Sequence, residues 1–335
     1  MNNLDFNGLY DLISKYDNIT IFSHLNPDYD ALGSAYGLKY LIEENFTNKK
    51  VEVALKSKGI LFPKYVEIND EFIKSSLAII LDLSVYNRIE DQRFQDALLK
   101  VRLDHHPDED VFDYSYANIN YAATAELLTD FVIEKQLKLN NNAVNALYRG
   151  LLSDTQAFKT SNTTYKTLEK AAFLVKNNAD IRRLNSEAFN VPLNVYRFQS
   201  AMISNELEID DSFGYIIVKY EYLAKYQVTY SEAKRIVNSI SNIQGVDIHA
   251  LFVENEDGSY NGSLRSRYTQ VSDVANEYNG GGHKNAAGVS NLTKLQVNEI
   301  IQKLKIKSQN WLFFINWKEK LWKYQNLLNQ MMKSI

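Results

Sequence analysis

Residues Ile21–Ser34, with the sequence IFSHLNPDYDALGS, determine how the first half of the chain is interpreted. A mostly apolar run over 19–22 stops at a histidine, a proline and two aspartates, and a helical pattern resumes at Ala31. This pattern predicts a buried strand followed by a helix. Ligands of open α/β sheets bind at the carboxyl ends of strands, and imidazole and carboxylate groups bind divalent metals. A lone Asp-Xaa-Asp is more often solvated or caps a helix, so a metal site needs support from elsewhere in the chain.

The composition restricts the class of protein and its partners. A chain of 335 residues, with 45% hydrophobic and 23% charged residues, predicts two globular domains. Its net charge of −4 gives no basic surface for long duplex nucleic acid, so any nucleic-acid partner should be short. There is no cysteine, so a metal would have to sit on histidine and carboxylate. The absence of a targeting segment or a long apolar run predicts a cytoplasmic protein with no membrane span.

The first half alternates between strand and helix patterns. Strands are expected over 19–23, 51–55, 77–81 and 101–103. Helices are expected over 9–15, 31–44, 121–136 and 142–152, with another starting after Asn162-Thr163-Thr164 and running to 175. The alternation predicts an α/β domain over 1–180, with a doubly wound, mostly parallel sheet.

The second half predicts a smaller α/β domain. Residues 181–209 should form a helical linker, and residues 210–306 carry strand patterns over 214–220, 247–253 and 260–265. Helices are expected over 231–239, 271–278 and 294–304. Residues 307–335 hold all three tryptophans and predict an amphipathic aromatic helix. Packing in a core or in a homodimer is preferred for this helix over contact with a membrane surface.

Acids and imidazoles gather after the predicted strands and at one helix end. The set comprises His24, Asp28, Asp30, Asp82, Asp104, His105, His106 and Asp154. Six such ligands suit two metal ions that share one carboxylate. Carboxylates this close could not all stay ionised unless cations neutralised them. His249 lies inside a strand pattern and is interpreted as structural.

These residues fall into four separated motifs, which are 24–30 (HLNPDYD), Asp82, 104–106 (DHH) and Asp154. The motifs resemble the DHH phosphoesterase superfamily in residue identity, order and spacing. The resemblance implies one metal held by His24, Asp28 and Asp82, and a second held by Asp30, Asp82, His105 and Asp154. It also implies that the ions are Mn²⁺, with Mg²⁺ or Co²⁺ as alternatives. Asp104 would orient a histidine, and His106 would face the substrate phosphate or the leaving oxygen.

Two motifs of the second half extend the resemblance. Residues 262–267 (GSLRSR) and 280–288 (GGGHKNAAG) resemble the DHH-associated substrate domain of oligoribonucleases called nanoRNases. A lone triple glycine is more often a flexible turn, but here its N–H groups could cradle a phosphate beside a histidine and an arginine. The expected substrate-binding residues are Arg265, Ser266, Arg267, Gly280, Gly281, Gly282 and His283. Ala123 and Gln156 depart from the family pattern and could change substrate preference.

The resemblance implies hydrolysis of short RNA of about two to five nucleotides to 5′-mononucleotides. It also implies removal of a phosphate from 3′-phosphoadenosine 5′-phosphate (pAp) to give AMP. The alternative within the enzymes is a phosphodiesterase of linear or cyclic dinucleotides. A pyrophosphatase is less expected, because the glycine-histidine motif belongs to the nucleotide-handling branch. A long-strand exonuclease is disfavoured, because such members of the superfamily usually add a nucleic-acid-binding domain for which 335 residues leave no room. A non-catalytic nucleotide sensor is the rival from another class.

Overall fold

The computed structural model describes residues 2–56, 63 and 65–309. The chain divides into two compact units, with unit 1 ending at Asn190 and unit 2 beginning at Val191. Most of the predicted C-terminal helix over 307–335 lies outside the described residues. Among the described residues, no helix is both long and apolar enough to cross a membrane.

Unit 1 contains a parallel sheet. Its strands are β1 (Asn2–Asn3), β2 (Asn18–Phe22), β3 (Lys50–Val53), β4 (Leu77–Leu81), β5 (Leu99–Asp104) and β6 (Tyr114–Ala117). They lie in the order β1-β6-β5-β4-β2-β3, and every neighbouring pair is parallel. The chain moves from β2 outward to β3 and then returns to the other side of β2 to form β4. This reversal creates a switch point between β2 and β4, where doubly wound sheets bind ligands.

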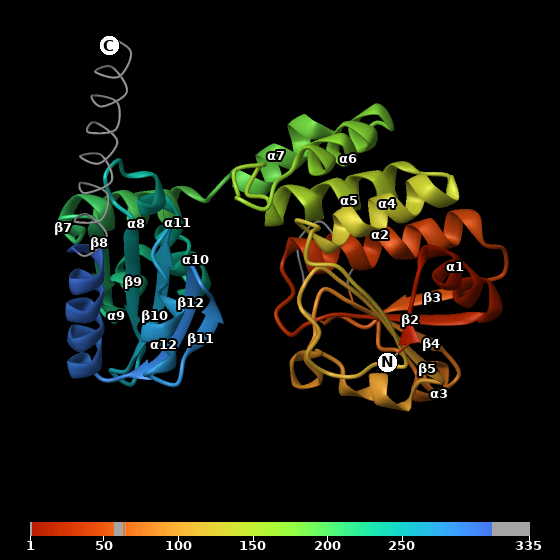
Figure 1. The fold of residues 1–335 in the computed structure, drawn as a ribbon, viewed down its shortest axis with the longest axis horizontal. Helices are drawn as coiled ribbons and strands as arrows, with labels where there is room; N and C mark the ends of the chain where they lie inside the picture. Colours follow the sequence, from red (N-terminus) through yellow and green to blue (C-terminus); the bar gives the residue numbers. More distant parts are fainter. Residues whose placement is uncertain (1, 57–62, 64, 310–335) are drawn as a thin grey trace, which may run out of the picture. The chain divides into compact units, whose positions relative to one another are not determined.

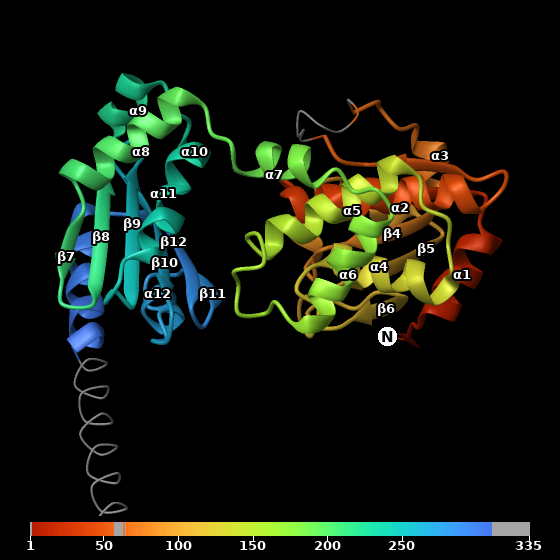
Figure 2. The same cartoon turned by 90° about the horizontal axis from the view of Figure 1, so that it is seen from above.

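Helices cover both faces of this sheet because its strands are apolar on both sides. The helices are α1 (Phe6–Lys15), α2 (Tyr29–Asn45), α3 (Asp70–Lys74), α4 (Thr124–Lys135), α5 (Asn141–Asp154), α6 (Tyr165–Lys176) and α7 (Ile181–Phe189). The side chains of Ile19 and Ile21 belong to one hydrophobic core, which they share with α1, α2, α4 and α5. The side chains of Phe22 and Ile80 belong to a second core, which they share with α3. Figures 1 and 2 show these layers in unit 1. The predicted doubly wound α/β fold is therefore confirmed.

Unit 2 is built on a mixed sheet. Its strands are β7 (Glu208–Asp210), β8 (Phe213–Val218), β9 (Ile248–Glu254), β10 (Tyr260–Ser266), β11 (Gly281–His283) and β12 (Ala286–Leu292), in the order β11-β12-β10-β9-β8-β7. Its helices are α8 (Leu193–Asn205), α9 (Tyr220–Tyr226), α10 (Tyr230–Lys234), α11 (Ile236–Ser239), α12 (Ser272–Asn276) and a helix over 294–309. Phe198 and Leu251 pack on one face, and Phe252 and Ile300 pack on the other.

The sequence patterns missed several elements. Strand β6 is a short polar-aromatic segment that pairs with β5. Strands β11 and β12 are rich in glycine and alanine, so the pairing of β12 with β10 and of β11 with β12, rather than residue preference, makes these two segments strands. Helix α4 begins at Thr124 rather than at Tyr121. The segment over 181–209, predicted as one linker, is divided, because α7 packs on α5 of unit 1 and α8 packs on β8 of unit 2.

Candidate metal centre

The predicted ligands meet at the carboxyl edge of the unit 1 sheet. His24 follows β2, Asp82 follows β4, and Asp104 ends β5 immediately before His105 and His106. Asp154 is the last residue of α5. Since parallel strands end at a common edge, side chains distant in sequence are collected beside the switch point.

One group of potential ligands contains His24, Asp28 and Asp82. Its ligand atoms lie within 4.8 Å of one another. His24 Nε2 is 3.9 Å from Asp28 Oδ2 and 3.8 Å from Asp82 Oδ2. Such separations leave room for an ion between atoms that each bind metals at about 2.0–2.2 Å.

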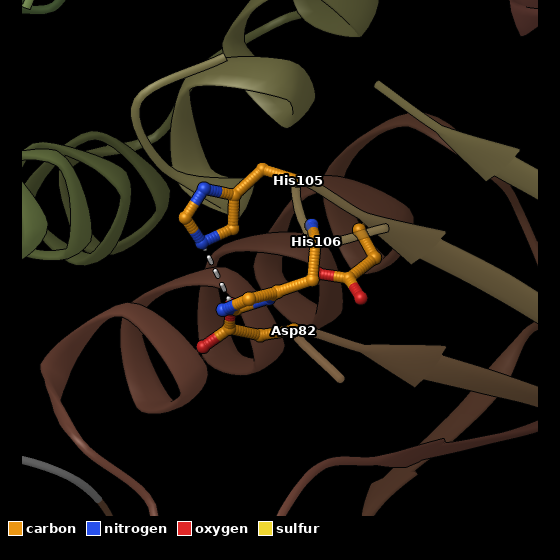
Figure 3. Close-up of side chains that lie close together, drawn as sticks. Asp82, His105 and His106 are labelled. Carbon is orange, nitrogen blue, oxygen red and sulfur yellow. Dashed lines mark hydrogen bonds and ion pairs between the residues drawn. The ribbon is translucent and has the colours of Figure 1, made fainter. Parts of the chain in front are cut away.

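Asp30, His105 and Asp154 form a second group, with ligand atoms again within 4.8 Å. His105 Nε2 is 3.4 Å from Asp82 Oδ1 and 3.5 Å from Asp154 Oδ2. The two oxygens of Asp82 therefore face the two groups separately. Figure 3 shows the His105 and His106 rings close to the Asp82 carboxylate.

The histidine rings are oriented as metal ligands commonly are. Backbone carbonyls lie 3.0 Å from His24 Nδ1 and 3.3 Å from His105 Nδ1, at Leu25 and Tyr121 respectively. Because a carbonyl only accepts, Nδ1 carries the proton and Nε2 keeps its lone pair for an ion. His105 Nε2 is buried and has no hydrogen-bond partner among the described residues. An orphaned acceptor beside carboxylates fits a divalent cation.

Asp30 is fully buried and is held by backbone donors that the sequence patterns did not reveal. The N–H groups of Thr124 and Ala125 donate to it at 2.7 and 3.0 Å, and Thr124 Oγ1 donates to Asp82 Oδ1 at 3.1 Å. Ala123, the residue preceding α4, gives no side-chain cap. The Asp30 carboxylate thus accepts the free N–H groups at the N-terminus of α4 in place of a local capping side chain. The positive end of the helix dipole favours a negative charge on Asp30.

Glycines allow α5 to approach α2 closely enough to place Asp154. A Cβ on Gly33 would lie 2.5 Å from the Ala146 carbonyl oxygen, and a Cβ on Gly150 would lie 2.7 Å from Asp30 Oδ1. Both contacts are too short for a real side chain. Gly33 therefore lets the backbone of α5 approach α2.

Burial and neighbouring carboxylates disfavour the ionised forms of Asp30, Asp82 and Asp154. Burial raises the pKa of Asp30 to about 6. The pKa values of Asp82 and Asp154 are also raised well above the usual range, by burial and then by neighbouring carboxylates, with Asp30 the foremost of these. A cation among them would reverse this effect, because it would favour the charged form. The charge distribution thus indicates an ion-binding site.

Asp104 differs from the other acids. Burial would raise its pKa, but hydrogen bonding to His106 and the charge of Arg102 bring that pKa below its usual value. It accepts the backbone N–H of His106 at 3.1 Å and lies 2.8 Å from His106 Nδ1. An ionised Asp104 therefore fixes the His106 proton on Nδ1.

Arg102 is a second residue that the sequence patterns missed. It is fully buried, and Nε donates to Leu83 O at 2.9 Å while Nη2 donates to His106 O at 3.0 Å and Pro107 O at 3.1 Å. It also forms ion pairs with Asp104 and Asp108. Arg102 thus holds the loop that carries the two histidines.

Asp82 has a backbone conformation that is costly for a residue with a Cβ. Its φ is 62°, in the left-handed region. Gln156, Ala157 and Phe158, which closely follow Asp154, also have φ between 45° and 65°. Strain of this kind, about 1–2 kcal/mol a residue, gathers at functional sites.

In unit 2 the strand register aligns two of the predicted substrate-binding residues, Arg265 and His283. Arg265 is opposite His249 on β9 and Ala286 on β12, and Ala286 is opposite His283 on β11. These positions form one row across four strands. Arg265 Nη1 donates to the carbonyls of Leu264 at 2.9 Å and Ala287 at 3.2 Å. His249 is buried, and its pKa is lowered to about 4 by burial and then by Arg265 and Arg267.

Arg267 and Ser266, two further predicted substrate-binding residues, form hydrogen bonds within unit 2. The Arg267 guanidinium donates to Ser241 O at 2.7 Å and Ile243 O at 3.3 Å, and Ser266 Oγ accepts from Asn285 Nδ2 at 2.8 Å. These two side chains have partners inside the unit.

The triple glycine is part of a β-hairpin rather than a turn. A Cβ on Gly280 would lie 2.3 Å from Gly288 O, and Gly282 has φ of 135°. A Cβ on Gly281 would meet open space, so backbone there is accessible.

The sequence matches two known protein families, one in each unit. Residues 18–151 match the DHH family N-terminal domain, and residues 214–308 match the DHHA1 domain. The chain belongs to the DHH family. It is therefore a phosphoesterase, a hydrolase of a metal-dependent family.

Named relatives cover most of the chain. It is 36% identical over 297 residues to the probable bifunctional oligoribonuclease and PAP phosphatase NrnA of Streptococcus mutans, covering 88% of this chain and 96% of that protein. It is 31% identical over 284 residues to the bifunctional oligoribonuclease and PAP phosphatase NrnA of Bacillus subtilis, covering 83% and 90%. A solved structure described as an exopolyphosphatase-related protein from Bacteroides fragilis has a TM-score of 0.80 at 20% identity, covering 91% of this chain and 97% of that one. That likeness shows a shared fold.

Proposed function

We propose that this chain degrades short oligoribonucleotides, of about two to five residues, to 5′-mononucleotides, and dephosphorylates pAp to AMP. The observation that carries the proposal is Asp82, whose two oxygens face two separate groups of histidine and carboxylate ligands. The names of the relatives in Streptococcus mutans and Bacillus subtilis support these substrates.

Two divalent cations, Mn²⁺ in the first place, are proposed for these groups. His24, Asp28 and Asp82 would hold one ion, and Asp30, Asp82, His105 and Asp154 would hold the other. Bound ions of this kind supply Lewis acidity toward a phosphate and a lowered pKa for water. His106, with its Nδ1 proton on Asp104, would present Nε2 to a phosphate or leaving oxygen. Asp104 and Arg102 would keep that ring in position.

Unit 2 is proposed to bind the far end of the substrate. Backbone N–H groups around Gly280–Gly282, together with His283, would bind a phosphate, and Arg265 would add a planar pair of donors. Ser266 and Arg267 would support that strand end. The predicted cytoplasmic location and homodimer stay predictions.

The test is a turnover profile of the full chain. Substrates are pAp, RNA of about two to ten nucleotides, and linear and cyclic diadenylates, each with Mn²⁺ and with EDTA. We expect pAp and the shortest RNAs to give the highest kcat/KM, and EDTA to abolish turnover. His283→Ala should chiefly raise KM for short RNA. Faster turnover of a diadenylate would favour the dinucleotide phosphodiesterase, and metal binding without any turnover would favour the sensor.

A further inference from the structure

A pocket of about 100 Å³ in unit 1 is lined by residues outside the proposed ligand groups. It lies among α2, α5 and α7, and its polar lining residues are Tyr40, Asn142, Asn145, Arg149, Arg183 and Glu187. None of these residues was predicted from the sequence to bind a ligand.

Arg149 is the unusual residue of this pocket. It is only 2% exposed, and its guanidinium lies over the ring of Tyr29, with Cζ 4.0 Å from the ring centre. Nη1 donates to Glu187 Oε2 at 2.9 Å. Nε and Nη2 are buried and have no hydrogen-bond partner among the described residues. Leaving buried charged donors unpaired is strongly unfavourable, so such groups indicate a missing partner.

The surrounding groups are mainly donors. Arg183 lies 3.2 Å from Asp180 and 3.4 Å from Glu187, so the one carboxylate that lines the pocket is shared by two guanidinium groups. Asn145 Oδ1 accepts the Asp180 N–H at 2.9 Å, so its NH2 group is left to donate. Two arginines and amide donors around a single glutamate suit an oxyanion.

The size of the pocket narrows the ligand class. Its volume exceeds the ~10–15 Å³ that one water requires by this kind of measure. It is smaller than the roughly 300–1,000 Å³ of pockets that enclose drug-sized ligands. A single tetrahedral oxyanion fits these limits, whereas a whole nucleotide could place only one phosphate inside.

We propose that this pocket is a binding site for a phosphate group, either inorganic phosphate or the phosphate end of a nucleotide. Arg149 is the buried donor, and Arg183 is the donor nearer to solvent. Tyr29, on which Arg149 stacks, lies between Asp28 and Asp30 in the chain, so Arg149 connects the pocket to the first turn of α2.

The test uses the full chain freed of metal with EDTA, so that phosphate cannot bind through ions. Inorganic phosphate and AMP are titrated separately at constant ionic strength, with Tm and calorimetry as readouts. We expect a saturable rise in Tm with at least one of them. Arg149→Met, which keeps volume but removes the donors, should weaken binding by about tenfold or more. Calorimetry is done at a temperature where the variant is folded, because loss of the Glu187 pair lowers the Tm by itself.

Arg183→Gln is the second variant, in case Arg149→Met does not fold, and it should also weaken binding. Arg93→Gln is the control, because Arg93 pairs with Asp70 and Asp91 and does not line the pocket. A response to AMP alone would assign the phosphate to a nucleotide. No saturable response in the natural chain, or an undiminished response in both pocket variants, would overturn the proposal.

Discussion

At the carboxyl edge of the unit 1 sheet, buried aspartates crowd one another, and burial first and then neighbouring carboxylates raise their pKa values. In unit 2, by contrast, Arg265 and Arg267 donate to backbone carbonyls of their own unit. The carboxylates of the first region favour a cation, whereas the two arginines of the second already have hydrogen-bond partners, Arg265 through Nη1. The difference assigns metal dependence to unit 1.

Asp82→Asn should have the largest effect. Asparagine tolerates the left-handed backbone but removes the charge shared by the two ligand groups. We expect kcat to fall by about a thousandfold, or roughly 4 kcal/mol in activation free energy, for pAp and RNA alike. Steady-state kinetics with saturating Mn²⁺ measures this. More than a tenth of the natural activity on any substrate would break the proposed bridging role.

Removal of metal should make the stability of unit 1 fall as pH rises. The pKa of Asp30 is about 6 in the folded chain, against 3.8 for an ordinary aspartate, because burial raises it. At pH values between these two pKa values, the folded state binds more protons than the unfolded state. The free energy of unfolding therefore decreases as pH rises, by roughly 3 kcal/mol for Asp30 alone.

Hydrogen exchange of metal-free protein, from about pH 4.5 to about 7.5, checks this after correction for intrinsic rates. Peptides of α2 and α5 should lose protection as pH rises, and Mn²⁺ should restore it. Peptides of β9 and β10 serve as the internal control. Equal pH dependence in both units would remove the contrast between them.

Arg265→Gln and Arg267→Gln form a matched pair in unit 2. We expect Arg265→Gln to raise KM for short RNA about tenfold with little change in kcat, because a charge-assisted donor to phosphate is lost. Arg267→Gln should instead lower unit 2 stability by about 0.5–1 kcal/mol, because Ser241 O and Ile243 O lose an exposed donor that water can replace in part. Kinetics and thermal unfolding of both variants separate these effects. A similar rise in KM in both would show that Arg267 also contacts substrate.

Gln156→Gly should give the smallest change. Glycine relieves the φ of 45° at this position but adds backbone entropy to the unfolded chain, so we expect a net stabilisation of about 0.5 kcal/mol. Gln156→Ala is the control, since it keeps the Cβ and should give no such gain. Calorimetric unfolding detects the difference. Equal stability of the two variants would show that the backbone there is unstrained.

Much of unit 1 could be predicted because β2 and β4 are largely apolar, β3 and β5 alternate between apolar and polar residues, and histidine or aspartate stands at the ends of β2, β4 and β5. The ends of β2, β4 and β5 placed His24, Asp82 and Asp104 on one edge, and the structure gathers them there. Arg102 was missed because a buried arginine within a strand looks like an exposed position of an alternating pattern. Thr124 and Ala125 act through backbone N–H groups, which no residue pattern reveals.

Unit 2 was harder to predict because its outer strands lack strand-forming residues. The segment Ala286–Leu292 contains alanine, glycine, serine and asparagine, and it forms β12 through pairing with β10 and β11. The same lack of signal hid the β-hairpin around Gly281 and Gly282. Sequence motifs identified the residues there, but only the strand register shows which of them share a row.

Mn²⁺ binding to the metal-free chain, measured by calorimetry and by metal content after dialysis, tests the central claim most directly. Two ions per chain are expected in the natural sequence, and Asp82→Asn should lose at least one of them. No stoichiometric Mn²⁺ in the natural chain, or the same stoichiometry and affinity in Asp82→Asn, would contradict a pair of cations joined by this carboxylate.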